Sequence, residues 1–65
     1  MTVAITEPLW TIEEVSTFLR IPVHTLYQWR SRHTGPRAFK VGRHLRYDPS
    51  DVRSWLAEQV DENGR

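Results

Sequence analysis

The stretch TIEEVSTFLRIPVHTLYQWRSR, residues 11–32, contains two helix-forming patterns with a proline between them. Its first four residues match a capping box, in which the Thr11 hydroxyl accepts from the amide of Glu14 and the Glu14 carboxylate accepts from the amide of Thr11. Apolar side chains follow at helical spacing, at Ile12, Val15 and Leu19, with Phe18 beside them. We therefore predict a first helix over residues 11–19.

A second helix is predicted to begin at Pro22 and to run to about Arg32. Proline is tolerated at the first helical position because the amide that it lacks is not needed there. Leu26 and Trp29 lie one turn apart and supply a narrow apolar seam, which leaves a wide polar face. Two helices joined by about three residues predict a helix-turn-helix, whose second helix enters the major groove of DNA.

Residues 38–47 form two short alternating runs on either side of Gly42-Arg43. Apolar and polar residues that alternate around a short turn predict a β-hairpin. The polar positions of the strands carry Lys40, His44 and Arg46, while the apolar positions of both strands can face a core. A basic hairpin that follows a helix-turn-helix is a wing.

The segment Asp48-Pro49-Ser50-Asp51 is typical of a helix start, with Asp48 as the cap and Pro49 at the first helical position. The apolar stripe of this third helix consists of Val52, Trp55 and Leu56. The expected fold is mainly α with a small β-hairpin, a winged helix-turn-helix of three helices and a two-stranded wing.

This domain is predicted to occupy residues 9–57, between a flexible arm over residues 1–8 and an acidic polar tail over residues 58–65. A domain this small needs large aromatic side chains to supply buried area. We therefore assign a structural role to each tryptophan, namely Trp10, Trp29 and Trp55.

Charge is distributed unevenly along the chain, although the formal net charge is only +1. From Arg20 through Tyr47 there are seven Lys and Arg side chains and no acid, whereas both flanking segments are net acidic. A concentrated positive surface on a small domain attracts a polyanion. The leading candidate partner is nucleic acid.

Size and composition exclude several other classes of protein. The chain has 65 residues and no cysteine, so one small core is possible but a disulfide or thiolate site is not. The three histidines are spaced by nine and eleven residues, which argues against a metal site. No residue grouping suggests catalysis, so we predict no enzyme and no cofactor. Without a membrane span of roughly 20 apolar residues or a secretory signal, we expect a soluble cytoplasmic protein with no membrane partner.

The exposed face of the second helix carries side chains that can read a DNA sequence. Gln28 can pair with N6 and N7 of adenine, and His24 and Arg32 can donate to guanine. Tyr27 leaves two interpretations open, a ring that braces the wing or a hydroxyl that reaches a phosphate. The alternative for the whole face is a solvated polar surface. The contacts predicted in this helix are His24, Thr25, Tyr27, Gln28, Arg30 and Arg32.

The wing is predicted to add contacts with the DNA backbone and the minor groove. Arg43, at the tip, would enter a narrow A·T-rich minor groove. Arg20, in the turn between the helices, is a further candidate for a phosphate contact. The alternative role of the wing charges is to keep a short hairpin from pairing with other chains. The contacts predicted in the wing and the turn before it are Arg37, Lys40, Arg43, His44 and Arg46.

Four segments carry a set of recognisable motifs: LWTIEEV at residues 9–15, TLYQWR at 25–30, FKVGRHLRY at 39–47 and SDVRSWL at 50–56. In order and spacing they resemble the excisionase, or recombination directionality factor, family, whose domain is a winged helix-turn-helix related to the MerR-type DNA-binding domain. The chain departs from the family at two turn positions. Arg20 stands where the family often has glycine, and Pro22 where a capping serine is common.

The resemblance implies an architectural role in site-specific recombination, in which the protein binds repeated sites beside an integrase and promotes excision of a phage or integrated element. The implied partners are double-stranded DNA, a site-specific integrase and further copies of the chain on adjacent sites. A small transcriptional regulator would need the same groove contacts, so that alternative stays open. A third hypothesis is an adaptor that binds an acidic protein partner.

Overall fold

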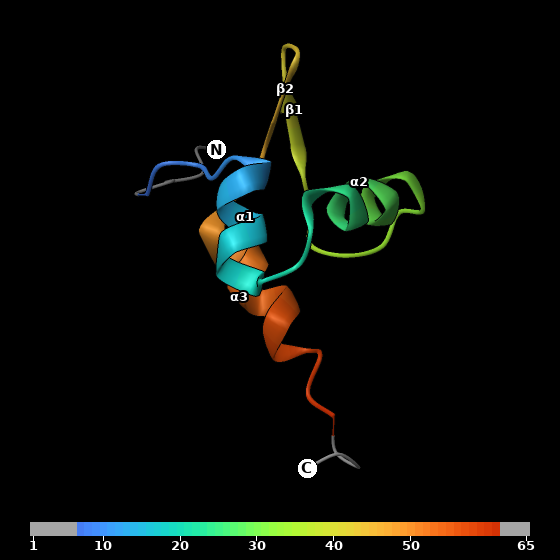
Figure 1. Ribbon diagram of the computed structural model, residues 1–65. Helices are drawn as coiled ribbons and strands as arrows, with labels where there is room; N and C mark the ends of the chain where they lie inside the picture. The colour runs from blue at the N-terminus through green and yellow to red at the C-terminus, as the bar shows by residue number, and fades with distance from the viewer. Residues whose placement is uncertain (1–6, 62–65) are drawn as a thin grey trace.

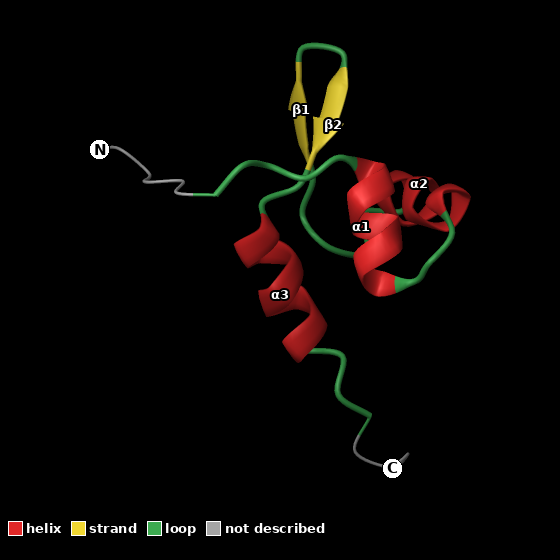
Figure 2. Ribbon diagram, turned by 60° about the vertical axis from the view of Figure 1, so that its left-hand side comes forward, coloured by secondary structure: helices red, strands yellow, loops and turns green. Residues whose placement is uncertain are grey.

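The computed structural model describes residues 7–61, which contain three helices and one hairpin. In chain order the elements are α1 (Ile12–Leu19), α2 (Val23–Ser31), β1 (Phe39–Val41), β2 (His44–Arg46) and α3 (Pro49–Ala57). The hairpin projects from the helical body in both views (Figures 1 and 2). This arrangement confirms the predicted winged helix-turn-helix. Residues 1–6 of the predicted arm and 62–65 of the predicted tail lie outside the described residues.

The start of α1 is the predicted capping box. The amide of Glu14 donates to the Thr11 hydroxyl at 3.1 Å, and the amide of Thr11 donates to the Glu14 carboxylate at 2.8 Å. The helix ends at Arg20, whose φ of 58° is left-handed. The amides of Arg20 and Ile21 both donate to the carbonyl of Ser16, and the Ser16 hydroxyl donates to the Ile21 carbonyl at 2.6 Å. These bonds fix the direction in which the chain enters α2.

The second helix begins at Val23, directly after Pro22. Pro22 is the residue before the helix rather than its first residue, and its carbonyl accepts from the amides of Thr25 and Leu26 at 3.0 and 3.2 Å. Proline is therefore accepted here because its extended backbone (φ −59°, ψ 147°) suits a cap. It has no side-chain oxygen, so no side chain caps the first turn of α2.

The C-terminus of α2 is closed by a second left-handed residue, His33, with φ 59°. The amide of Thr34 donates to the Trp29 carbonyl at 2.8 Å, and that of His33 donates to the Arg30 carbonyl at 3.1 Å. This pair of bonds is a Schellman motif, which satisfies carbonyls left without partners at a helix end. It turns the chain out of α2 and into the loop that leads to the hairpin (Figure 1).

The register of the hairpin decides which strand positions share a face. Val41 pairs with His44 across the turn, and Lys40 pairs with Leu45. Directly opposite residues of an antiparallel pair share a face. The apolar positions of the two strands therefore lie on opposite faces, and the prediction that those of both strands can face a core is wrong. Val41 is 53% exposed, whereas Leu45 packs against the core.

The third helix starts as predicted. The Asp48 carboxylate accepts from the amide of Ser50 at 3.0 Å, and Pro49 is the first helical residue. After Ala57 the chain stays close to the helix, because the amides of Glu58 and Gln59 donate to carbonyls of the last turn at 3.0 and 2.9 Å.

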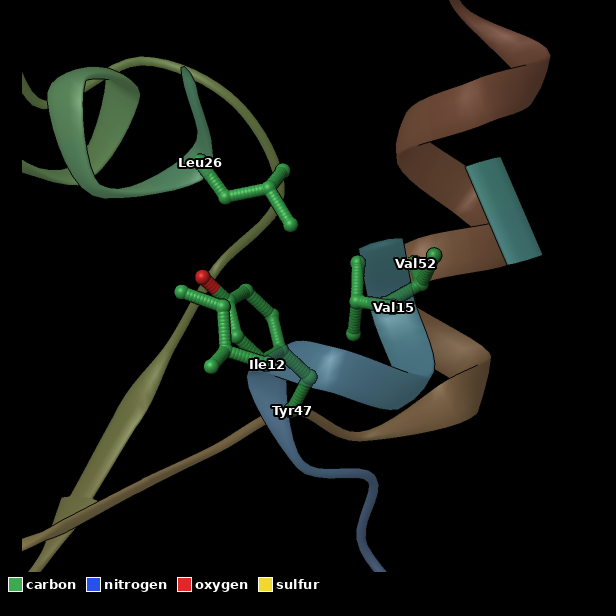
Figure 3. Close-up of a cluster of buried hydrophobic side chains, with 5 residues drawn as sticks. All are labelled: Ile12, Val15, Leu26, Tyr47 and Val52. Carbon is green, nitrogen blue, oxygen red and sulfur yellow. The ribbon is translucent and has the colours of Figure 1, made fainter. Parts of the chain in front are cut away.

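The core lies where the three helices meet the end of β2. Its buried side chains are shown in Figure 3 and are Ile12, Val15, Leu26, Tyr47 and Val52. Trp10 and Tyr47 also pair through their backbones, with N–H to O=C distances of 2.7 and 2.8 Å. That bridge ties the segment before α1 to the base of the wing.

Aromatic pairs extend this small core toward the surface. The rings of Trp29 and Trp55 are 5.4 Å apart and join α2 to α3, and those of Trp10 and Phe18 are 4.9 Å apart. Trp10 and Trp29 also pack against the buried cluster. The three tryptophans thus occupy positions consistent with the structural role assigned to them.

Candidate nucleic-acid interface

The face of α2 that turns away from the core carries most of the predicted contact residues. Leu26 is buried and Trp29 is half-buried, which fixes the orientation of the helix. His24 and Gln28 are exposed one turn apart, and Arg32 is exposed at the residue that ends the helix. Thr25 is half-buried; the other exposed members of the predicted set are Tyr27 and Arg30. The exposed face of α2 is therefore wide and polar, as contact with a DNA groove requires.

The positively charged side chains and the histidine of the wing differ in their exposure to solvent. Lys40, Arg43 and His44 are exposed, and Arg43 lies in the turn at the tip beside Gly42, whose φ is 63°. Arg46 is half-buried, and its guanidinium donates to the carbonyl of Leu45 at 2.7 Å. Because one donor of Arg46 is used internally, this side chain is less available to a ligand than sequence reasoning expected.

The cations of the basic segment are not neutralised by acids. Within residues 7–61, none of the seven Lys and Arg side chains between Arg20 and Tyr47 forms an ion pair. The ion pair present in that range joins Arg53 to Glu7 at 3.3 Å, outside the basic segment. Unpaired, exposed cations keep their full attraction for an anionic ligand.

The base of the wing meets the middle of α2 at Tyr47, which is 2% exposed. Burial raises the pKa of its hydroxyl above the usual 10.0, while the positive charge of Arg30 acts in the opposite direction and Tyr27 adds to the increase. Figure 3 shows the hydroxyl pointing toward α2. Tyr27 and Arg30 of α2 thus act electrostatically on the hydroxyl at the base of the wing. The sequence predicts Tyr47 only as an apolar strand position, because a core tyrosine and a contact tyrosine look alike in sequence.

A hollow of about 250 Å³ lies between the end of α2 and the start of β1. It brings together two predicted residues, Arg30 and Arg37, with two that were not predicted, His33 and Thr34. The guanidinium of Arg37 lies over the ring of Phe39 at 4.8 Å. The sequence signal for this hollow is a Gly-Pro turn flanked by cations. A turn motif, however, does not predict which side chains will lie close together around it.

Arg20 is exposed in the turn between α1 and α2. With Ser16, Thr17, Ile21 and Pro22 it lines a shallow depression there. No wing residue lines that depression, so Arg20 belongs to the entrance of α2 rather than to the hollow.

Other kinds of site find no support in residues 7–61. No group of three or more His, Asp or Glu side chains in that range could hold a metal ion. None of the helices described is long and apolar enough to cross a membrane.

Comparison with known proteins agrees with this geometry. Residues 11–60 match a family model described as a helix-turn-helix domain. The match runs from the cap of α1 past the end of α3, and so includes both the helix pair and the wing. Searches of curated proteins and of solved structures returned no match. A helix-turn-helix domain of this kind implies binding to double-stranded DNA. Because the match covers most of the sequence, the chain belongs to the helix-turn-helix domain family.

Proposed function

We propose that the protein binds double-stranded DNA with a sequence preference and acts as an excisionase, together with a site-specific integrase. The observation that carries the DNA assignment is the unpaired positive charge on α2, the following loop and the wing. Resemblance of the four sequence motifs to those of excisionases supports the finer assignment.

In this proposal α2 enters the major groove. Gln28 offers an amide that can donate to and accept from one adenine, and His24 offers a donor one turn earlier. Both side chains are exposed. Base contacts of this kind set sequence preference, while the cations around them set register and affinity.

The wing extends the contact beyond the major groove. In the proposal Arg43 at its tip would enter a minor groove, and Lys40 and His44 would approach phosphates on either side. Since Arg46 is partly occupied by the Leu45 carbonyl, we assign it a supporting role in holding the wing.

One module of this size makes few base contacts, so a single copy should bind weakly and with modest specificity. Several copies on adjacent sites would raise the effective affinity, and a bend in the DNA would allow them to meet an integrase. This is the reason for proposing an architectural role.

The recognition of DNA bases by α2 is tested with Gln28→Ala in a binding assay against a randomised duplex library. We expect the preferred sequence to change at one or two base pairs while salt dependence is retained. Gln59→Ala is the matched control, because Gln59 is also exposed but lies beyond α3. An unchanged preference in Gln28→Ala would refute the groove assignment of α2. Loss of binding on charge reversal alone would then favour the adaptor hypothesis.

The excisionase role is tested by reconstituting recombination with the cognate integrase, with and without this chain. Excision that rises severalfold on addition of the protein supports the proposal. Unchanged excision, together with control of a nearby promoter, would instead support a transcriptional regulator, which uses the same fold.

A further inference from the structure

The hollow between α2 and β1 has the properties of an anion site. Its lining consists of Arg30, His33, Thr34, Gly35, Pro36, Arg37 and Ala38. No acid is among these residues, and neither arginine has a carboxylate partner within residues 7–61. At about 250 Å³ it is smaller than the roughly 300–1,000 Å³ of pockets for drug-sized molecules. It suits a small anionic group.

The backbone around the hollow is held in place. The Trp29 carbonyl accepts from both the amide and the hydroxyl of Thr34, at 2.8 and 3.2 Å. Gly35 packs so closely on the ring of Trp29 that an added Cβ would lie 2.8 Å from a ring carbon. Pro36 is buried. A preformed loop loses little conformational entropy when it takes a ligand.

The two arginines reach the hollow from different elements. Arg30 belongs to the last turn of α2, and Arg37 lies just before β1, with its guanidinium over Phe39 at 4.8 Å. Stacking on an aromatic ring limits where that guanidinium can go. Both arginines line the hollow, and each can donate to a phosphate oxygen; such bonds are among the stronger hydrogen bonds in proteins.

His33 supplies a third hydrogen-bond donor. Its left-handed backbone conformation favours glycine, so the local fold gives no reason for a side chain at this position. Its φ of 59° is one that glycine adopts without strain, whereas a non-glycine residue there is strained. His33 is exposed and is one of the residues that line the hollow.

We propose that this hollow binds one phosphodiester group of the DNA backbone, held by Arg30, Arg37 and His33. The proposal rests on the proposed function, and it places a phosphate clamp between the groove-reading helix and the wing. Held at that point, the backbone would set the register of both elements on the duplex.

The first test compares Arg37→Ala and His33→Gly with wild type in salt titrations of DNA binding. We expect Arg37→Ala to weaken binding about tenfold on every sequence and to make the salt slope shallower by about 0.9. His33→Gly should weaken binding while folding at least as stably, which separates loss of contact from loss of structure. Arg53→Ala, which removes an exposed charge outside the hollow, is the matched control and should leave the slope unchanged.

The second test locates the phosphate by replacing single linkages of the bound duplex with neutral methylphosphonates. At one position we expect wild type to lose about tenfold in affinity and Arg37→Ala to lose less than twofold, because that contact is already gone. Inorganic phosphate, titrated without DNA and followed by NMR, distinguishes a free anion as the ligand.

Four outcomes separate the possibilities. Coupled losses in the linkage scan support the clamp. A second outcome is that wild type binds DNA with full salt dependence, but that wild type and Arg37→Ala lose the same affinity at every replaced linkage. This overturns the clamp and leaves the DNA assignment intact. Saturation of the hollow by inorganic phosphate together with a flat linkage scan also overturns it. Failure of wild type to bind any duplex overturns the clamp and the proposed function together.

Discussion

Two side chains of the basic segment close helices in a conformation that usually belongs to glycine. Arg20 caps the C-terminus of α1 with φ 58°, and His33, the residue after the cap of α2, has φ 59°. Each position costs about 1 kcal/mol relative to an unstrained residue, and a domain of this size has only a few kcal/mol to spare. Both side chains are exposed and lie beside α2. In the proposed function both side chains contact DNA, and that contact would offset the cost.

Gly35→Ala tests how tightly the loop after α2 is packed. The added Cβ would meet the Trp29 ring at 2.8 Å, and the φ of +79° adds backbone strain. We expect the free energy of unfolding to fall by about 1–3 kcal/mol in urea titrations. Gly42→Ala is the control, since Gly42 has φ +63° but nothing within 4 Å of its added Cβ. Equal losses for the two variants would show that the loop does not pack on Trp29.

Tyr47→Phe tests the environment of the buried hydroxyl through pH. Burial raises the pKa of Tyr47 in the folded protein above its unfolded value of 10.0, so the neutral hydroxyl favours folding. That stabilisation is complete below about pH 10 and is lost as the pH rises through the folded pKa. We expect the stability of wild type to decline above about pH 10 more steeply than that of Tyr47→Phe, as followed by thermal unfolding. Parallel curves for the two proteins would contradict this environment.

Among the single elements, the wing is the one in which the inward or outward direction of each side chain depends on the register between its two strands. Each strand alternates apolar and polar residues, but the two-residue turn pairs Val41 with His44 and so places the two apolar sets on opposite faces. Val41 therefore faces away from the core.

Val41→Thr and Leu45→Thr together test this register. Val41 is 53% exposed, so its replacement should change the free energy of unfolding by no more than about 0.5 kcal/mol. Leu45 packs against the core, and the same change there should cost at least about 1 kcal/mol. The measurement is chemical denaturation of both variants. A larger loss for Val41→Thr than for Leu45→Thr would mean that the strands are paired in another register.

The contrast between helices and hairpin shows what could be predicted from sequence. The capping box at Thr11 and the cap at Asp48 are local, so the starts of α1 and α3 were predicted correctly. The faces of the wing depend on cross-strand register, which a one-residue change in pairing reverses. For the candidate site, the sequence predicted the arginines but not the hollow. His33 and Thr34 join it only because the loop folds back on Trp29.

Over the whole molecule, a net charge of +1 conceals a basic segment between two net acidic ones. The ion pair between Arg53 and Glu7 lies outside the basic segment, whose cations remain unpaired within residues 7–61. Six of those seven cations are exposed; the seventh, Arg46, is half-buried and bonded to a carbonyl. The number of cations available to phosphates is therefore about six.

The most direct test of DNA binding is the salt dependence of that binding, measured by fluorescence anisotropy with the complete chain and a labelled duplex. If about six cations displace counterions, log K falls with log salt concentration at a slope near −5. A slope near zero would contradict the assignment of the basic surface to DNA.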